Sequence, residues 1–136
     1  SLSELRVSWN GLADRGARAL GEALASNAAL SVLDVESNAI KDEGAKALAK
    51  GLWANGALKT LMLSFNQITD SGASAIAKAM EVNTVLISLH LDDDTLQDRG
   101  ILDTITESYR ENASPARLAA KKTQIADNNL ASRDEL

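Results

Sequence analysis

The sequence of 136 residues contains no cysteine, a single proline and few aromatic side chains, which make up 3% of the total. Without cysteine the chain forms neither a disulfide framework nor a thiolate metal site, and this composition is typical of a reducing compartment. No run of apolar residues approaches the length of about 18 that a membrane-spanning helix requires, and no signal-peptide pattern opens the chain. We therefore expect a cytoplasmic protein with no membrane segment.

Positive charge is also in deficit, with 14 lysines and arginines against 19 aspartates and glutamates and a net charge of −5. Proteins that bind phosphate backbones need a basic footprint, so a nucleic acid is not an expected partner. The same acidic balance disfavours binding to an anionic membrane surface.

One pattern dominates what the sequence does contain. Glycine recurs at an interval of 28 residues (44−16, 72−44, 100−72), at Gly16, Gly44, Gly72 and Gly100. Leucine, isoleucine and asparagine recur at the same interval around these glycines. A fixed period of this size is the signature of a solenoid, in which stacked units share one core. We divide the chain into four repeats, residues 1–29, 30–57, 58–85 and 86–112, followed by a C-terminal cap or tail, residues 113–136.

Each repeat changes its apolar period internally. In the second repeat, Leu33 and Val35 are spaced by two residues, which predicts a short strand. After Gly44 the spacing becomes helical, as at Leu48 and Leu52. Because the other repeats contain the same two patterns, each is predicted to form a strand, a turn and a helix.

An asparagine follows each of the first three predicted strands, at Asn10, Asn38 and Asn66. Its amide can bond backbone groups that leave the strand, and stacked copies can form a ladder. A buried unpaired backbone group costs about 1–3 kcal/mol, so we expect Asn38→Ala to destabilise the fold by a similar amount. We interpret the four repeated glycines as structural too, because they lie near the predicted helix starts, where packing is tight.

Three stretches carry a family resemblance: LSELRVSWNGLADRGARALGEALASNAAL, LSVLDVESNAIKDEGAKALAKGLWANGAL and LKTLMLSFNQITDSGASAIAKAMEVNTVL. Their pattern resembles the ribonuclease-inhibitor-like class of leucine-rich repeats. The resemblance implies an α/β fold, a right-handed horseshoe segment with a parallel sheet on the concave side and helices on the convex side. The class contains inhibitors, actin-capping tropomodulins, GTPase activators for Ran, innate-immune receptors and flagellar proteins, so the resemblance leaves the activity open.

The fourth repeat departs from the pattern, with Asp94 in place of the asparagine and one extra residue after Gly100. Terminal repeats are often atypical because they cap the core. Ser114 and Pro115 predict the start of a further helix. We expect this helix to cover the fourth repeat with an apolar face made of Leu118, Ala119, Ile125 and Leu130.

The ends of the sequence leave alternatives open. Residues 117–130 loosely resemble the end of tropomodulin, although no strand is predicted between the last repeat helix and this tail. Leu2 already fills a consensus position, so the first strand is predicted to have an open edge. Either the chain is a fragment of a longer solenoid, or this face of the first repeat meets a partner or a second copy of the chain. Residues 133–136 either form an endoplasmic-reticulum retrieval signal or match one by coincidence.

Strand residues that alternate with the core leucines are predicted to face the concave side. We take this surface as the candidate site for a protein partner, with Arg6, Val32, Asp34, Glu36, Met62, His90 and Asp92 as candidate residues. Trp9 and Phe65 come directly before asparagines. They are interpreted either as local packing at the strand–turn corner or as anchors for the partner, since aromatic residues often anchor interfaces.

Catalytic and metal chemistry find little support in the sequence. His90 is the only histidine, and although Ser88 shares its strand face, an open sheet offers no pocket that excludes water. A run of carboxylates is interpreted as a solvated acidic corner: Asp92, Asp93, Asp94 and Asp98. Counted from Asp92, this run lacks the glycine and the glutamate that a calcium loop requires. Because P-loop and dinucleotide motifs are missing too, we predict that the chain is not an enzyme and holds neither a metal nor another cofactor.

Three functions remain open at this point. The first is a scaffold or recognition module that binds a protein through the concave sheet. The second is a regulator, such as a tropomodulin-like actin capper or a GTPase activator. The third is an architectural segment of a larger assembly.

Overall fold

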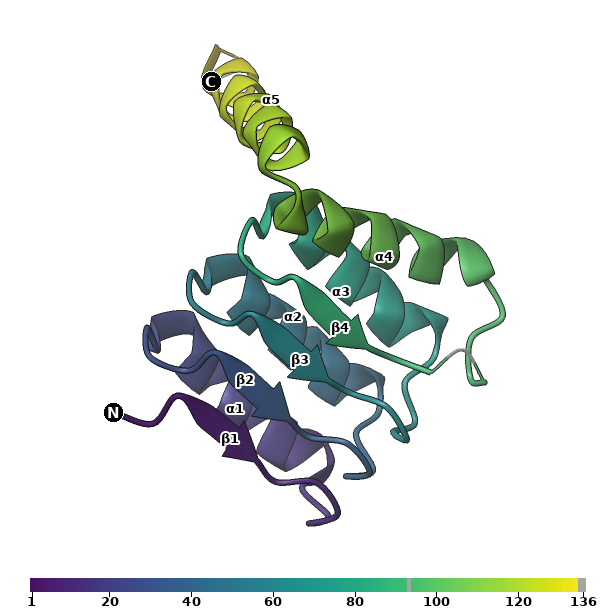
Figure 1. The fold of residues 1–136 in the computed structure, drawn as a ribbon. Coiled ribbons are helices and arrows are strands. Elements are labelled where there is room, and N and C mark those ends of the chain that lie inside the picture. The colour runs from purple at the N-terminus through teal and green to yellow at the C-terminus, as the bar shows by residue number, and fades with distance from the viewer. Residues whose placement is uncertain (93, 135–136) are drawn as a thin grey trace.

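Strands and helices alternate along the chain (Figure 1). The computed structural model describes residues 1–92 and 94–134, so Asp93 of the acidic corner and the last two residues of the retrieval-like tail lie outside the described residues. The strands are β1 (Glu4–Arg6), β2 (Val32–Asp34), β3 (Thr60–Met62) and β4 (Ser88–His90). The helices are α1 (Ala13–Ser26), α2 (Asp42–Ala54), α3 (Asp70–Val82), α4 (Arg99–Ala113) and α5 (Pro115–Asp134).

The four strands form one parallel sheet in sequence order, β1-β2-β3-β4. Paired residues of adjacent strands are 28 positions apart in the sequence, so the leucines at the same position of each repeat lie side by side: Leu5, Leu33, Leu61 and Leu89. Helices α1 to α4 stack along one side of the sheet, and no described helix covers the other side (Figure 1). We call this uncovered side the open face; it is the side that the sequence predicts to be concave. The predicted solenoid of strand–turn–helix units is confirmed.

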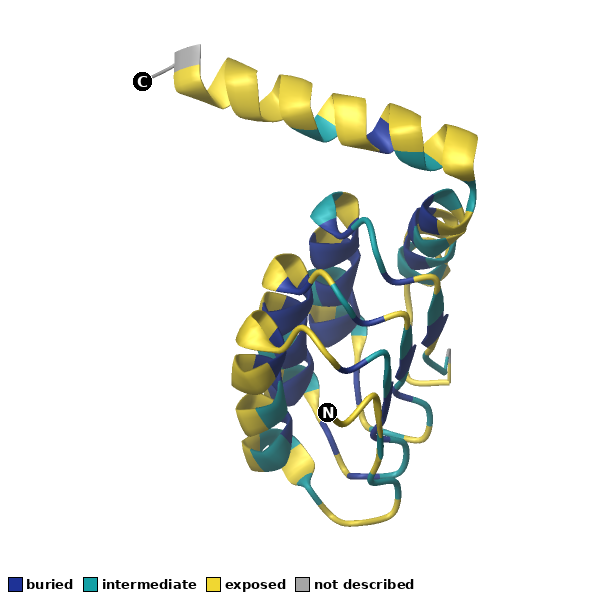
Figure 2. Cartoon of the chain, turned by 60° about the vertical axis from the view of Figure 1, so that its left-hand side comes forward, coloured by how far each residue is buried: buried dark blue, intermediate teal, exposed yellow. Residues whose placement is uncertain are grey.

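The buried residues lie on the sides of the sheet and of the stacked helices that face each other (Figure 2), and the core that they form is aliphatic. Leu33 and Leu61 on the strands and Leu48 and Ile76 on the helices are fully buried. Since each of these positions recurs in the neighbouring repeat, the core runs without interruption from layer to layer.

Glycines set how closely the repeats stack. A Cβ atom at Gly44 would lie 2.6 Å from Asp14 Oδ1 and 2.9 Å from the Cβ of Ala17, both on α1. Gly21 and Gly51 bring α1 and α2 still closer, because a Cβ on either glycine would collide with the backbone of the other helix. Neither of these two glycines belongs to the 28-residue series, so the periodicity alone does not reveal their role.

The first asparagine ladder joins the turns that follow the strands. Asn38 donates from Nδ2 to the carbonyl oxygen of Val7 in the preceding repeat, at 3.0 Å. Its Oδ1 accepts from the backbone N–H groups of Asn10 at 2.9 Å and Leu12 at 3.2 Å. Asn66 bonds the second repeat in the same way. A side chain from the next repeat therefore completes the backbone hydrogen bonding of each turn.

A second asparagine ladder lies where the helices end, and its members are Asn27, Asn55, Asn83 and Asn112. Asn55 is buried and donates from Nδ2 to the carbonyl oxygen of Leu24 at 2.8 Å, while its Oδ1 accepts from the N–H of Leu58 at 2.7 Å. Asn83 repeats this arrangement one layer further on. Only the first ladder is predicted above, although Asn27, Asn55 and Asn83 have the same spacing of 28 residues (55−27, 83−55).

Carboxylates near the helix starts form a third set of bonds between repeats. Asp42 Oδ1 accepts from the N–H groups of Thr69 at 2.8 Å and Gly72 at 3.0 Å. Partial burial acts to raise the pKa of Asp42, but the hydrogen bonds from Thr69 and Gly72 and the charge of Lys46 outweigh it, so the pKa lies below its ordinary value of 3.8. The stabilising contribution of this carboxylate is therefore present at neutral pH and is lost as the pH falls below about 4.

The first ladder leads to a stability prediction. Asn38→Ala should lower the free energy of unfolding by about 1–3 kcal/mol, because it leaves backbone groups of two repeats unpaired. Asn10→Ala is the matched control and should cost less, since the Asn10 side chain bonds the carbonyls of Val7 and Ser8 within its own turn. Urea titrations of both variants measure the difference. Equal losses at the two positions would contradict a ladder that acts between repeats.

Helix α5 leaves the stacked repeats after Ser114 and runs past the ends of the other helices (Figure 2). The predicted helix start is confirmed, and no strand separates α4 from α5. The predicted apolar contact, however, is largely absent. Leu118 and Ile125 are half-buried, whereas Ala119 is exposed and Leu130 is 56% exposed.

A buried lysine attaches α5 to the repeats instead. Lys121 Nζ donates to the carbonyl oxygens of Met80 at 2.7 Å and Asn83 at 2.8 Å, and to Asn112 Oδ1 at 2.9 Å. Three acceptors match the three protons of the ammonium group, and the two carbonyls belong to the C-terminal end of α3, where a positive charge is favourable. Burial lowers the pKa of Lys121, and the nearby charge of Glu111 opposes this shift. The contact is thus polar where an apolar one was expected.

We predict that Lys121→Met loosens α5. Hydrogen bonds to charged groups contribute about 1.5–3 kcal/mol, so amide exchange in α5 should quicken at least tenfold while α1 to α3 change little. Lys122→Met removes an exposed neighbouring lysine and serves as the control. Hydrogen exchange followed by mass spectrometry reports each helix separately, and unchanged protection of α5 in Lys121→Met would refute the anchoring role.

Candidate protein-binding surface

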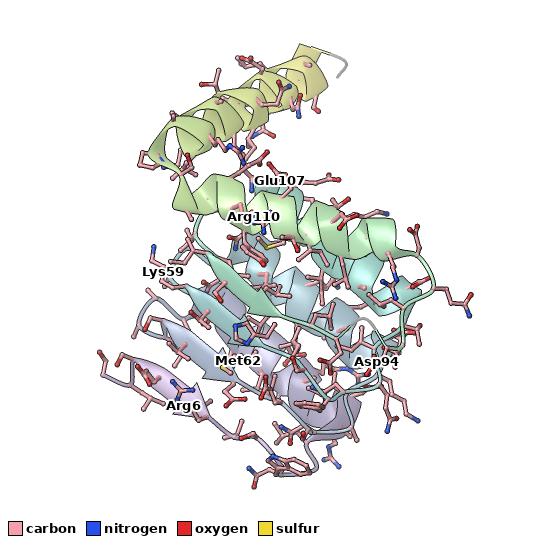
Figure 3. All side chains as sticks on the ribbon, turned by 45° about the vertical axis from the view of Figure 1, so that its right-hand side comes forward. Arg6, Lys59, Met62, Asp94, Glu107 and Arg110 are labelled. Carbon is pink, nitrogen blue, oxygen red and sulfur yellow. The ribbon has the colours of Figure 1, made fainter. Side chains whose placement is uncertain are left out.

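The open face carries side chains in rows that cross the strands, because the strands stand in register. The middle row is Arg6, Asp34, Met62 and His90. The row before it is Glu4, Val32, Thr60 and Ser88. The row after it, one step beyond the strands, is Ser8, Glu36, Ser64 and Asp92. These rows bring all seven candidate residues of the concave surface together, and Figure 3 labels Arg6 and Met62 on this face.

Arg6 is the most connected side chain of the middle row. Its Nη1 lies 3.9 Å from Asp34 Oδ2 and 3.9 Å from Met62 Sδ, and its Nη2 lies 3.4 Å from Glu4 Oε2. Asp34 is only 7% exposed, so its carboxylate is largely covered although it lies in the middle row of the open face. The cause is that Asp34 Oδ1 accepts the N–H of Glu36 at 3.1 Å while the guanidinium lies against its other oxygen.

Ser88 and His90 come together at the β4 end of the face. Ser88 Oγ lies 3.3 Å from His90 Nε2, and both side chains point away from the core. Within the described part of the chain, no carboxylate bonds to the other side of the imidazole. His90 also lines a shallow hollow of about 340 Å³ between β4 and α4, together with Thr106 and Tyr109.

Beyond the strands, Trp9, Ser37 and Phe65 occupy the same position in three successive repeats. All three have left-handed backbones, with φ values of 62°, 53° and 59°. Trp9 is 82% exposed and Phe65 is 71% exposed, so their interpretation as local packing at the corner is wrong. They line a hollow of about 370 Å³ whose other walls are Ser37, Ala39 and Gln67.

Two polar groups accompany this hollow. Ser37 Oγ is buried and has no hydrogen-bond partner among the residues described, which is uncommon for a buried hydroxyl. Glu36 precedes Ser37 in the chain and is half-buried on the open face. Its carboxylate forms neither an ion pair nor a hydrogen bond with any residue that the structure describes.

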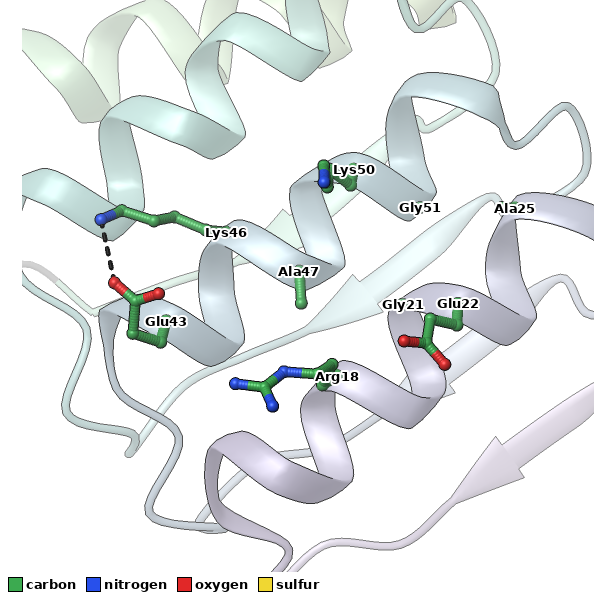
Figure 4. A pocket seen from close by; sticks show the side chains of 9 residues that line it. All are labelled: Arg18, Gly21, Glu22, Ala25, Glu43, Lys46, Ala47, Lys50 and Gly51. Carbon is green, nitrogen blue, oxygen red and sulfur yellow. Dashed lines mark hydrogen bonds and ion pairs between the residues drawn. The ribbon is translucent and has the colours of Figure 1, made fainter.

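A separate hollow of about 570 Å³ lies on the helix side, between α1 and α2 (Figure 4). Its floor contains the small residues Gly21, Ala47 and Gly51, and charged side chains surround it. Lys46 Nζ pairs with Glu43 Oε1 at 3.1 Å in an exposed bridge. Such surface pairs contribute little to stability. The hollow follows from the close approach of the two helices at glycine and was not predicted from the sequence.

The described part of the chain comprises residues 1–92 and 94–134. In this part of the chain no three His, Asp or Glu side chains cluster as ligands for a metal ion. None of its helices combines the length and the apolar character needed to cross a bilayer.

A family model described as "Leucine Rich repeat" matches residues 1–21, 26–49 and 57–77. The chain is built of leucine-rich repeats. The three matched segments fall in the first three repeats, each of which supplies one strand and one helix of the solenoid. No curated protein sequence matches this repeat protein significantly.

Two of the solved structures that are similar to the leucine-rich-repeat chain illustrate the likeness. One is the actin-binding site 2 of leiomodin-1, with a TM-score of 0.60 and 20% identity, covering 96% of this chain and 88% of that one. The other is the C-terminal domain of tropomodulin from Caenorhabditis elegans, with a TM-score of 0.54 and 16% identity, covering 88% of this chain and 89% of that one. At such identities the likeness establishes the fold.

Phe65, an exposed aromatic residue with a left-handed backbone, allows the backbone strain at this position to be tested. Phe65→Gly should keep the free energy of unfolding unchanged or raise it by up to about 1 kcal/mol. A left-handed conformation costs an L-residue about 1–2 kcal/mol, which exceeds the extra entropy that glycine loses on folding. Phe65→Ala keeps the Cβ and the strain, so it should be less stable than Phe65→Gly. A loss above about 3 kcal/mol in thermal or urea unfolding, as for a buried phenylalanine, would show that the ring supports the fold.

Proposed function

We propose that this leucine-rich-repeat chain is a protein-binding module that engages its partner, in the cytoplasm, through the open face of the sheet. The observation that carries the proposal is that the rows of side chains on this face stand in register on a rigid backbone and are covered by no described helix. A sheet backbone held in this way needs no reordering when a partner arrives, which lowers the entropic cost of association.

The chemistry of the face indicates what it recognises. Met62, near the centre, is a flexible apolar side chain that adapts to different partner surfaces. Arg6 is held by acidic neighbours and can form forked hydrogen bonds to a carboxylate or a carbonyl of the partner. Glu36 and Asp92 border the row and favour a partner with basic residues at the rim of the contact.

Replacing Arg6 and Met62 together by glutamate should abolish partner binding, because it reverses one charge and places another at the centre of the face. Asp34 is left unchanged, since it is buried and its replacement would disturb the fold. The matched control is Ala25→Glu with Lys50→Glu, which makes the same change in net charge at exposed positions of α1 and α2. Affinity capture followed by quantitative mass spectrometry compares the proteins retained. Identical sets from the two double variants and the unmodified chain would refute the open face as the binding site.

A second candidate partner is actin. The similar solved structure from leiomodin-1 is described as an actin-binding site, and the likeness extends over nearly the whole of this chain. Co-sedimentation with actin filaments and chromatography with monomeric actin test this candidate directly. Binding that disappears in the open-face double variant would unite the two proposals, whereas no binding to either form of actin would eliminate the second.

A further inference from the structure

Trp9 and Phe65 stand two strands apart on the same edge of the solenoid. The backbone N–H of Trp9 donates to the carbonyl of Glu36 at 3.1 Å, and that of Ser37 donates to Ser64 at 3.1 Å, so the parallel register continues into these turns. With about 4.8 Å between neighbouring strands, the two aromatic residues begin about 10 Å apart. Two rings at this separation can take one flat group between them, with Ser37 beneath it.

Nothing in the fold requires aromatic residues here. Both have left-handed backbones, which glycine adopts without strain, and both rings are mostly in solvent. The chain has four aromatic residues in total, and two of them line this one hollow. Local strain combined with exposed apolar rings is a feature of binding sites rather than of cores.

A carboxylate stands one residue away from the hollow in the chain. Glu36 directly precedes Ser37, the lining residue that lies between Trp9 and Phe65 in the register. The cation nearest in the rows is Arg6, which lies beside Asp34 and Glu4. The Glu36 carboxylate has no cationic partner in the described residues, and the excess of acidic residues in the chain adds to the negative potential.

Two exposed aromatic rings, with an unpaired carboxylate on the residue that precedes Ser37, complement a cation. Aromatic faces attract cations, and arginine is better suited than lysine because its guanidinium is flat, stacks on rings and is more weakly hydrated. The fork of the guanidinium can also bond both oxygens of a carboxylate.

We propose that Trp9, Glu36 and Phe65 form a recognition site for an arginine side chain of the protein partner. The guanidinium lies between the two rings and pairs with Glu36, while the peptide that carries it runs along the turns at the edge of the open face. This inference rests on the proposed function only in that the ligand is part of a protein. It adds a specificity site outside the strands.

Direct titration with a defined peptide tests the site without knowledge of the natural partner. Trp53→Phe makes Trp9 the sole tryptophan, so that its fluorescence reports on the hollow. The probes are the acetylated and amidated peptide Gly-Ser-Gly-Arg-Gly-Ser-Gly and the same peptide with citrulline, which has nearly the shape of arginine but no charge. The arginine peptide should bind saturably and at least fivefold more tightly than the citrulline peptide.

Variants of the site then assign the contacts. Glu36→Gln and Phe65→Gly should each weaken binding of the arginine peptide at least threefold, and Glu36→Gln should also remove most of the dependence on salt. Glu22→Gln, an exposed carboxylate on α1, is the matched control and should leave affinity unchanged. Amide spectra by NMR establish that each variant remains folded.

The outcomes separate this inference from the proposed function. Equal binding of the two peptides, no saturation by either, or full affinity in Phe65→Gly would each overturn the arginine site, whatever the open-face variant does. Conversely, an arginine-specific signal together with unchanged partner capture by the Arg6 and Met62 double variant would uphold the arginine site and reject the open face.

Discussion

The backbone N–H and carbonyl groups at the turns do not find all their hydrogen-bond partners within a single repeat, and the rest of the structure depends on this constraint. The chain reverses direction twice in each repeat, and each reversal leaves carbonyl and N–H groups outside the strands and helices. Asn38 serves one reversal of the preceding repeat and Asn55 serves the other. A repeat is therefore complete only when another is stacked on it, which makes the fold a one-dimensional array.

The same constraint explains how the array is finished by α5. In the repeats, Asn83 bonds the carbonyls of Leu52 and Asn55. One repeat further on, the corresponding carbonyls belong to Met80 and Asn83, and Lys121 bonds both. Asn112 of the fourth repeat bonds the carbonyl of Asn83 but not that of Met80, so the lysine from α5 supplies the hydrogen bond that this repeat does not make. For this reason the expected apolar cap is replaced by a polar contact.

Since the core and the ladders fix the backbone, the open face and the outer turn positions are free to vary. The core row is leucine in all four repeats, whereas the neighbouring row on the open face changes from Arg6 to Asp34, Met62 and His90. Trp9 and Phe65 are the most unusual of these variable positions. They place large apolar rings in solvent, and their left-handed backbones are of the kind that glycine adopts without strain. Positions that violate local preferences without a gain in packing are where function is to be sought.

The sequence by itself determined the number of repeats, the strand and helix in each, the core leucines and the first asparagine ladder. These follow from the spacing of residues along the chain, and a spacing of two or of three and four residues already implies which face a side chain occupies. The sequence also contains the second asparagine ladder, at the same interval of 28 residues. That ladder was not predicted, because asparagine is common at helix ends and its presence there does not by itself indicate bonds between repeats. The tertiary structure alone decided that Asp34 is covered, that Gly21 and Gly51 press two helices together, and that Trp9 and Phe65 share one hollow. The physical reason is that burial and contact depend on which atoms the adjacent layer brings within reach, and a period along the chain does not specify those atoms.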